Sequence, residues 1–150
     1  MHWGFVLLQP GRTPNRVTNT RDDKVQTTFW RPSFEQRRCL VRHPTVNQTT
    51  KAHALGTGSP STVTIAVRIP WCLAQLERSD KERPLTSRTS FITTLPNALT
   101  ASINHERIPV LLASEAEQEQ WLSGTPAEAY ILVRSFDAER MRIVQKGMAA

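Results

Sequence analysis

The sequence has no long apolar run and few cysteines. No stretch approaches the ~20 apolar residues that a membrane span requires, which excludes a transmembrane protein. The opening residues carry neither the basic segment nor the small-residue cleavage site of a secretory signal. Cys39 and Cys72, the two cysteines, form at most one disulfide, and without an export signal we expect both to be free thiols in a reducing compartment.

The common short motifs of catalysis and metal binding are also absent. The chain has no Gly-rich phosphate loop, no HExxH, no CxxC and no GxSxG. Its four histidines, His2, His43, His53 and His105, lie far apart and match no spacing of metal ligands. We therefore expect neither a metal ion nor another cofactor.

The charge is unevenly distributed along a chain of single-domain length. The 150 residues carry a formal net charge of +6. Residues 1–60 hold nine Lys and Arg against three Asp and Glu, whereas residues 61–150 hold ten of each. A basic half beside a neutral half is typical of a phosphate-binding surface, because neutralised phosphates release counterions. A solvated basic face without a ligand has the same composition, and charge alone does not separate the two.

The patterning predicts a mostly β chain with short helices near its end and no internal repeat. Strands are predicted over residues 1–8, 16–21, 37–41, 62–67, 89–94, 108–112 and 140–144. Ser33 is expected to cap a brief helical turn within residues 29–36, and residues 98–103 look helical. Clearer helices begin at the cap Ser114, ending at Gly124, and at Thr125-Pro126. Between His43 and about Pro70 no period persists outside residues 62–67.

Two groups of residues could carry chemistry. His105 has Glu106 and Arg107 as sequence neighbours, and an imidazole that titrates near neutral pH can act as a general acid or base. A histidine that only closes a loop by hydrogen bonds explains the same position. Asn19 and Arg21 form the second group, since an amide binds a sugar and a guanidinium clamps phosphate. An Asx turn with a surface arginine is the alternative there.

In chain order, these pieces resemble the SRAP family, the SOS response-associated peptidases. The family pattern runs from a Trp-Gly strand to a His-(Asp/Glu)-Arg-(Met/Ile)-Pro-Val-Leu-Leu motif and a helix with a tryptophan. The matching elements are Trp3-Gly4, Asn19-Thr20-Arg21, Arg38-Cys39-Leu40-Val41, Phe91-Ile92-Thr93-Thr94, Asn97-Ala98-Leu99, His105 to Leu112 and Trp121. The histidine motif and the strand before it are the specific parts, whereas Trp-Gly alone carries no information.

The resemblance implies a fold and an activity. The expected fold is α+β, a mainly antiparallel β structure with short peripheral helices, in one partial domain over residues 1–150. Residues 1–41 and about 88–147 resemble the family, and about 42–69 diverge from it. Members of the family repair DNA damage by linking themselves covalently to abasic sites in single-stranded DNA, and as peptidases they remove their own initiator methionine.

Two parts of the family's catalytic set have no counterpart in this sequence. The nucleophile is a cysteine at residue two, whereas this chain reads Met1-His2-Trp3. The catalytic glutamate follows the Arg-Cys-Leu-Val strand, whereas residues 42–47 contain no carboxylate. We therefore expect an N-terminally truncated, centrally disrupted member with impaired catalysis, and a compensated frameshift is our hypothesis for the divergent segment. Whether the chain is still an enzyme stays open, as does a pseudogene product.

The resemblance also assigns roles to residues of this chain. His105 is the catalytic residue that moves protons, and Asn19 holds the opened abasic sugar. Contacts to the remaining DNA are assigned to Trp3, Arg21, Arg37 and Arg38. The implied partner is single-stranded DNA with abasic sites, and the expected state is a monomer. The expected location is the cytoplasm, with association to the nucleoid when the protein is bound to DNA. No membrane, metal or cofactor is expected. A non-enzymatic basic module that binds single-stranded nucleic acid or a protein is the alternative.

Overall fold

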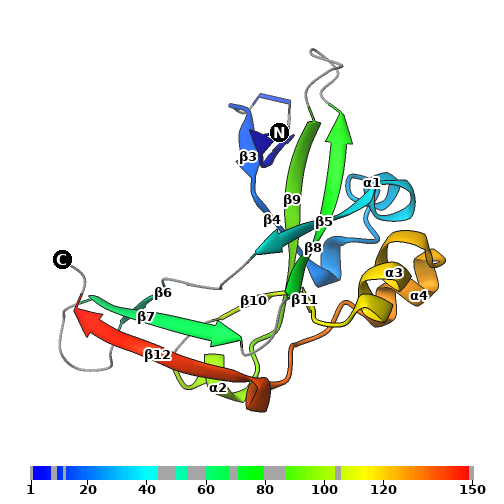
Figure 1. Cartoon of the computed structure of the whole chain (residues 1–150). Coiled ribbons are helices and arrows are strands. Elements are labelled where there is room, and N and C mark those ends of the chain that lie inside the picture. Colours follow the sequence, from blue (N-terminus) through cyan, green and yellow to red (C-terminus); the bar gives the residue numbers. More distant parts are fainter. Residues whose placement is uncertain are drawn as a thin grey trace.

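The computed structural model describes residues 2–7, 10–11, 13–43, 50–53, 60–67, 71–79, 87–103 and 106–148. These residues form a seven-stranded sheet, a three-stranded sheet and a two-stranded hairpin, with short helices at the rim (Figure 1). Most strand pairs are antiparallel, and two pairs in the large sheet are parallel. The α+β, mainly antiparallel fold predicted from the sequence is confirmed.

Strand β9 (Ser87–Thr94) is the centre of the large sheet. The other strands are β1 (His2–Trp3), β4 (Asn19–Arg21), β5 (Arg38–His43), β8 (Trp71–Ser79), β10 (Ile108–Pro109) and β11 (Leu111–Leu112). On one edge of β9, β1 and β4 pair in parallel, and on the other β8 and β10 pair antiparallel. Serine, threonine and one isoleucine dominate β9, and the β-branched members suit a strand with neighbours on both sides.

The segment Ile108–Leu112 is inserted between two strands of this sheet. Strands β8 and β9 pair with each other only up to Gln75 and Phe91. Beyond that point Val110 donates its backbone N–H to the carbonyl of Ile92 at 2.8 Å, and its own carbonyl accepts from Ala74 at 3.1 Å. Apart from half-buried Pro109, the side chains of this segment are buried. The apolar strand predicted here is therefore an interior strand of the sheet.

Gly4 divides the predicted first strand in two. Residues 1–8 were expected to form one strand, but β1 joins the large sheet and β2 (Phe5–Leu7) forms a hairpin with β3 (Asn15–Val17). Gly4 turns the chain with a φ of 87°, and a Cβ there would lie 3.2 Å from Cγ2 of Thr18. The left-handed conformation is accessible to glycine at little cost, which accounts for the Trp-Gly pair at this place.

A second sheet is formed by strands from the middle and the end of the chain. It contains β6 (Thr50–His53), β7 (Pro60–Val67) and β12 (Met141–Met148), with β7 between the other two. The strand predicted over 62–67 falls within β7. The one predicted over 140–144 begins one residue before β12, because Arg140 is the last residue of a 3-10 turn. Strand β6 lies where the sequence showed no period, because pairing with β7 and not its own pattern defines it.

The helices are short and begin at recognisable caps. They are α1 (Arg31–Gln36), α2 (Ala98–Ala101), α3 (Glu115–Ser123) and α4 (Pro126–Ile131), with the 3-10 turns η1 (Asp22–Lys24) and η2 (Ala138–Arg140). Ser114 and Thr125 each form a full capping box, as their positions before a glutamate predict. Ser33 is not a cap: the cap position of α1 is Trp30, and Ser33 lies buried inside the helix.

Helices α1, α3 and α4 cover one face of the large sheet with the main apolar core between them (Figure 1). Its largest fully buried side chains include Phe5, Phe34, Leu76, Ile92 and Trp121. A smaller cluster of Ile108, Leu111, Phe136 and Met141 packs with Phe91 and Leu99. One face of the large sheet is thus occupied by helices.

Arg38 joins the ends of two helices to the first residue of β5. Its guanidinium donates to the backbone carbonyls of Trp121 and Gly124 at the end of α3, and to that of Phe34 in α1 at 2.8 Å. Burial lowers the pKa of Arg38, which nevertheless stays charged at neutral pH. Helix ends leave carbonyls without intrahelical partners, and this planar fork supplies donors to several of them.

We predict that Arg38→Lys lowers the free energy of unfolding by about 1–3 kcal/mol, because one ammonium cannot reach all three carbonyls and unpaired buried groups are costly. Urea unfolding measures the effect. Arg31→Lys is the control, since Arg31 is exposed and, within the part of the chain that the structure describes, its ion pair is with Glu35 on the same helix. Equal stability of the two variants would contradict the role given to Arg38.

Gln75 is the opposite case, a buried polar side chain without a partner. It is fully buried on β8, and among the described residues none bonds its Oε1 or Nε2.

We predict that Gln75→Met raises the free energy of unfolding by about 1–3 kcal/mol, the cost of an unpaired buried amide. Gln118→Met is the matched control, because Gln118 donates to the carbonyl of Leu112 at 3.3 Å. Loss of stability in Gln75→Met would show that its amide is bonded after all.

Candidate functional site

Three segments that are distant in sequence meet at Thr93 of β9. Arg21 on β4 and Pro109 on β10 are both register partners of Thr93, from opposite edges of the strand. Thr93 Oγ1 donates to the carbonyl of Thr20 at 3.3 Å, which fixes β4 against β9. We call the place where β4 and the segment before β10 flank β9 at Thr93 the crossing. It brings together the Asn-x-Arg and histidine motifs.

Trp3, Asn19 and Arg21 follow one edge of β9 at alternate positions. Their register partners are Thr89, Phe91 and Thr93. Positions two residues apart on a strand share a face and are separated by about 6.6 Å. Asn19 and Arg21 are exposed, whereas Thr20 between them is buried and shares a hydrogen bond with the hydroxyl of Ser90 at 2.9 Å. The amide and the guanidinium thus face solvent from a strand whose backbone is held in place.

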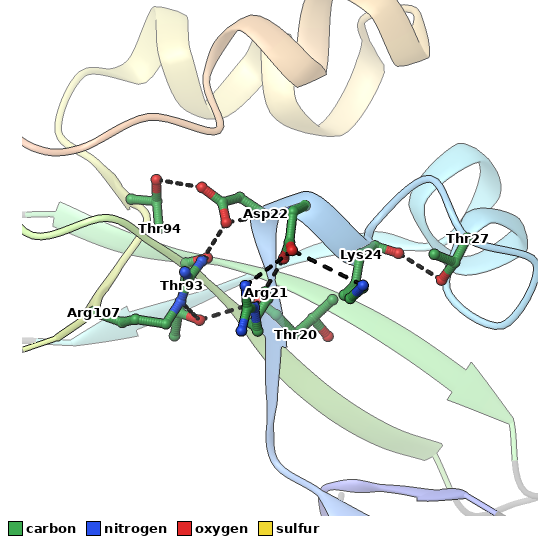
Figure 2. A network of polar contacts seen from close by, with 9 residues as sticks. Thr20, Arg21, Asp22, Lys24, Thr27, Thr93, Thr94 and Arg107 are labelled. Carbon is green, nitrogen blue, oxygen red and sulfur yellow. Dashed lines mark hydrogen bonds and ion pairs between the residues drawn. The ribbon is translucent and has the colours of Figure 1, made fainter.

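An ion pair crosses β9 at the same level (Figure 2). Arg107 pairs with Asp22, and its guanidinium also donates to the carbonyl of Thr93 at 2.7 Å and to its hydroxyl at 3.2 Å. The other oxygen of Asp22 accepts from Thr94 Oγ1 at 2.8 Å. Burial opposes the ionisation of Asp22, but the hydrogen bonds from Thr94 and Arg107 outweigh it and lower its pKa. The carboxylate of Asp22 is therefore charged at neutral pH.

A second, more exposed pair lies beside the first. Arg21 binds both oxygens of Asp23, at 2.9 and 3.0 Å, and Lys24 approaches the same carboxylate at 4.0 Å (Figure 2). The hydrogen bond from Arg21 lowers the pKa of Asp23. Each arginine at this crossing is thus partly neutralised by an acid from η1.

The other arginines assigned to DNA lie elsewhere. Arg38 bonds helix carbonyls, as described above, and belongs to the face that the helices cover. Arg37 is half-buried and donates to the carbonyl of Glu77 at 3.2 Å. The structure therefore brings Asn19 and Arg21 together, with Trp3 on the same edge, but not Arg37 and Arg38. A contact of these two arginines with DNA stays a prediction.

His105, together with Asn104, lies outside the described residues. The chain resumes at the exposed Glu106 and at Arg107, and Ile108 pairs with Thr94. Its assignment as the residue that moves protons stays a prediction. The side chain of Trp3 also lies outside what the structure describes, although its backbone pairs with Thr89.

Neither cysteine is placed as a nucleophile. Burial, assisted by the charge of Glu77, raises the pKa of the Cys39 thiol to about 12. Its backbone carbonyl accepts from Trp121 Nε1 at 3.0 Å, so Cys39 sits against the core helix α3. Cys72 is buried on β8. A thiolate is the reactive form, and burial disfavours it at Cys39.

Within the described part of the chain, no three His, Cys, Asp or Glu side chains gather as a metal site would need. The same residues include no helix with the length and apolar character to cross a bilayer.

Sequence reasoning missed two members of the site, Asp22 and Arg107. Arg107 stood in the recognised motif beside His105 without a role of its own. Asp22 follows the Asn-x-Arg motif directly, and 85 positions separate it from Arg107. The position of Asp22 next to a basic motif suggests that it forms an ion pair, but the sequence does not indicate which arginine is its partner.

Crystal structures with the same fold exist. A protein from Bacteroides thetaiotaomicron has a TM-score of 0.69 and 26% identity, over 86% of this chain and 59% of that one. A protein from Bordetella bronchiseptica has a TM-score of 0.70 and 14% identity, over 99% and 75% of the chains. A phage-related protein from the same species has 0.69 and 16%, over 98% and 68%. The chain thus spans about three fifths of the first relative, and the other two show the fold alone.

No curated protein sequence matches the chain. The pattern of the SOS response associated peptidase family matches residues 1–147, and this range includes residues 42–69, which looked least like the family. Because the match runs over nearly the whole chain and includes both motifs that meet at Thr93, this protein belongs to the SOS response associated peptidase (SRAP) family.

Proposed function

We propose that this chain binds single-stranded DNA along the β4 edge of β9 and recognises an abasic site there. The observation that carries the proposal is the crossing at Thr93, where Arg21 and Arg107 flank the same residue of β9 and Asn19 is exposed next to them. Guanidinium groups bind phosphate well, and an exposed amide both donates to and accepts from a sugar. Membership of the family supports DNA as the ligand.

The proposed roles follow from the positions of the residues. Asn19 binds the opened sugar, Arg21 and Arg107 contact flanking phosphates, and Trp3 offers a surface on which a base can stack. His105 moves protons, as the family resemblance implies. Since phosphate contacts carry no sequence information and stacking tolerates any base, we expect little sequence preference.

We further propose that neither Cys39 nor Cys72 forms a covalent link to the abasic aldehyde. A thiol with a pKa of about 12 is ionised to the order of 10⁻⁵ at pH 7, which removes Cys39 as an effective nucleophile. In this proposal the two cysteines stabilise the fold, and DNA is held by non-covalent contacts.

A binding experiment tests the first proposal. A labelled oligo-dT with one tetrahydrofuran abasic analogue should bind more tightly than the matching duplex, measured by fluorescence anisotropy at several salt concentrations. Arg21→Ala should weaken binding about three- to tenfold and flatten the salt dependence, because one phosphate contact is lost. Arg134→Ala is the control, since Arg134 is exposed and pairs with Glu117 on α3.

His105→Ala should leave the affinity nearly unchanged, because its proposed role is proton transfer and not binding. Equal affinity for duplex and single strand, or no difference between Arg21→Ala and Arg134→Ala, removes the nucleic-acid proposal and favours a protein partner for this face.

A denaturing gel tests the second proposal. After incubation with single-stranded DNA that carries a natural abasic site, without reductant, we expect no band that depends on a cysteine. The chain and its Cys39→Ser and Cys72→Ser variants should give the same pattern. A covalent band that disappears in Cys39→Ser would show that this thiol reacts despite its burial.

A further inference from the structure

We propose that Asp22 is an intramolecular competitor for phosphate at Arg107, and that it restricts this face to polyanionic chains by excluding single small phosphates. The inference rests on the proposed function, because it concerns the strength and selectivity of the same phosphate contacts. Figure 2 shows the arrangement: Asp22 and Arg107 approach each other across β9, next to Arg21.

Asp22 is held in its place by other groups besides Arg107. Thr94 Oγ1 donates to one carboxylate oxygen at 2.8 Å, and the backbone N–H of Asp23 donates to the other at 3.0 Å. Its side chain is only 23% exposed. A carboxylate fixed in this way does not swing out into solvent when an anion arrives. It occupies one side of the guanidinium as a tethered ligand with a high effective concentration.

Arg107 does not depend on Asp22 for its position. Its guanidinium also donates to the carbonyl and the hydroxyl of Thr93, at 2.7 and 3.2 Å, and Thr93 belongs to the central strand. Among the described residues, none accepts a hydrogen bond from Nη1 of Arg107. Removal of the Asp22 charge should therefore leave the guanidinium in place and better able to bind an anion.

The expected selectivity follows from this competition. A single phosphate that binds Arg107 must do so beside a fixed negative charge, so its affinity is low. A DNA strand makes several contacts at once, and its contacts with Arg21 and Asn19 raise its local concentration at Arg107. The additional contacts of a DNA strand compensate for the repulsion by Asp22, whereas a free phosphate has no such contacts.

The opposite role, in which Asp22 orients Arg107 for DNA, predicts the opposite result. Removal of the charge would then weaken binding. Asp22→Asn separates the two roles. The amide oxygen can still accept from Arg107 and from the backbone N–H of Asp23, the amide nitrogen can donate to the hydroxyl of Thr94, and the negative charge is lost. Glu119→Gln is the matched control, because it removes one exposed carboxylate from α3 and changes the net charge of the chain equally.

Anisotropy with the tetrahydrofuran oligo-dT at several KCl concentrations provides the first measurement. We expect Asp22→Asn to bind about fivefold more tightly than Glu119→Gln at low salt, with the slope of log affinity against log salt steeper by about 0.7. In an Arg107→Gln background, Asp22→Asn should change nothing, because the competition acts through Arg107. Weaker binding by Asp22→Asn, or no difference from Glu119→Gln, overturns the proposal.

Inorganic phosphate provides a second measurement that does not depend on DNA. Phosphate should raise the melting temperature of Asp22→Asn in a concentration-dependent way, and that of the unmodified chain and of Glu119→Gln much less. If no variant binds DNA but phosphate stabilises Asp22→Asn selectively, the proposed function fails and the competition stands. If DNA binds but phosphate stabilises all variants equally, the competition fails and the proposed function stands.

Discussion

The arrangement of this protein depends on the pairing of β9 along both of its edges. Strands β1 and β4 are paired with one edge and β8 and β10 with the other, so residues 2–3 and 19–21 are brought to the same strand as residues 108–109. The insertion of Val110 between Ile92 and Ala74 makes this pairing continuous with β8. Without the pairing along both edges of β9, the Asn-x-Arg segment and the histidine motif would not be held next to each other.

The same pairing leaves the large sheet with one face buried under helices and one edge exposed to solvent. One face is committed to the core by α1, α3 and α4, and Arg38 and Trp121 bond backbone carbonyls there. The β4 edge keeps Asn19 and Arg21 exposed. Charges on this edge are balanced locally, since Asp23 pairs with Arg21 and Asp22 with Arg107. The net positive charge of the first 60 residues is therefore less available at the crossing than the composition indicates.

Local signals made part of this structure predictable. The caps Ser114 and Thr125, the stop at Gly124 and the β-branched run of β9 each specify a short segment through its own residues. The family motifs placed Asn19 and Arg21 together. What could not be predicted depends on contacts between distant residues: β6 is defined by its partner β7, Arg38 by the carbonyls of two helices, and Asp22 by an arginine 85 positions away. Ser33 shows the converse, because a good cap residue does not set a helix start where Trp30 and Pro32 already do.

The central claim is that single-stranded DNA binds at the crossing of β4, β9 and the segment before β10. Backbone amide chemical shifts in two-dimensional NMR, recorded while an unlabelled abasic oligo-dT is added, test it most directly. The account predicts that the largest changes fall on residues 19–24, 91–94 and 106–108, and that α3 and α4 change little. Changes centred on α3 and α4, with the crossing unaffected, would contradict it.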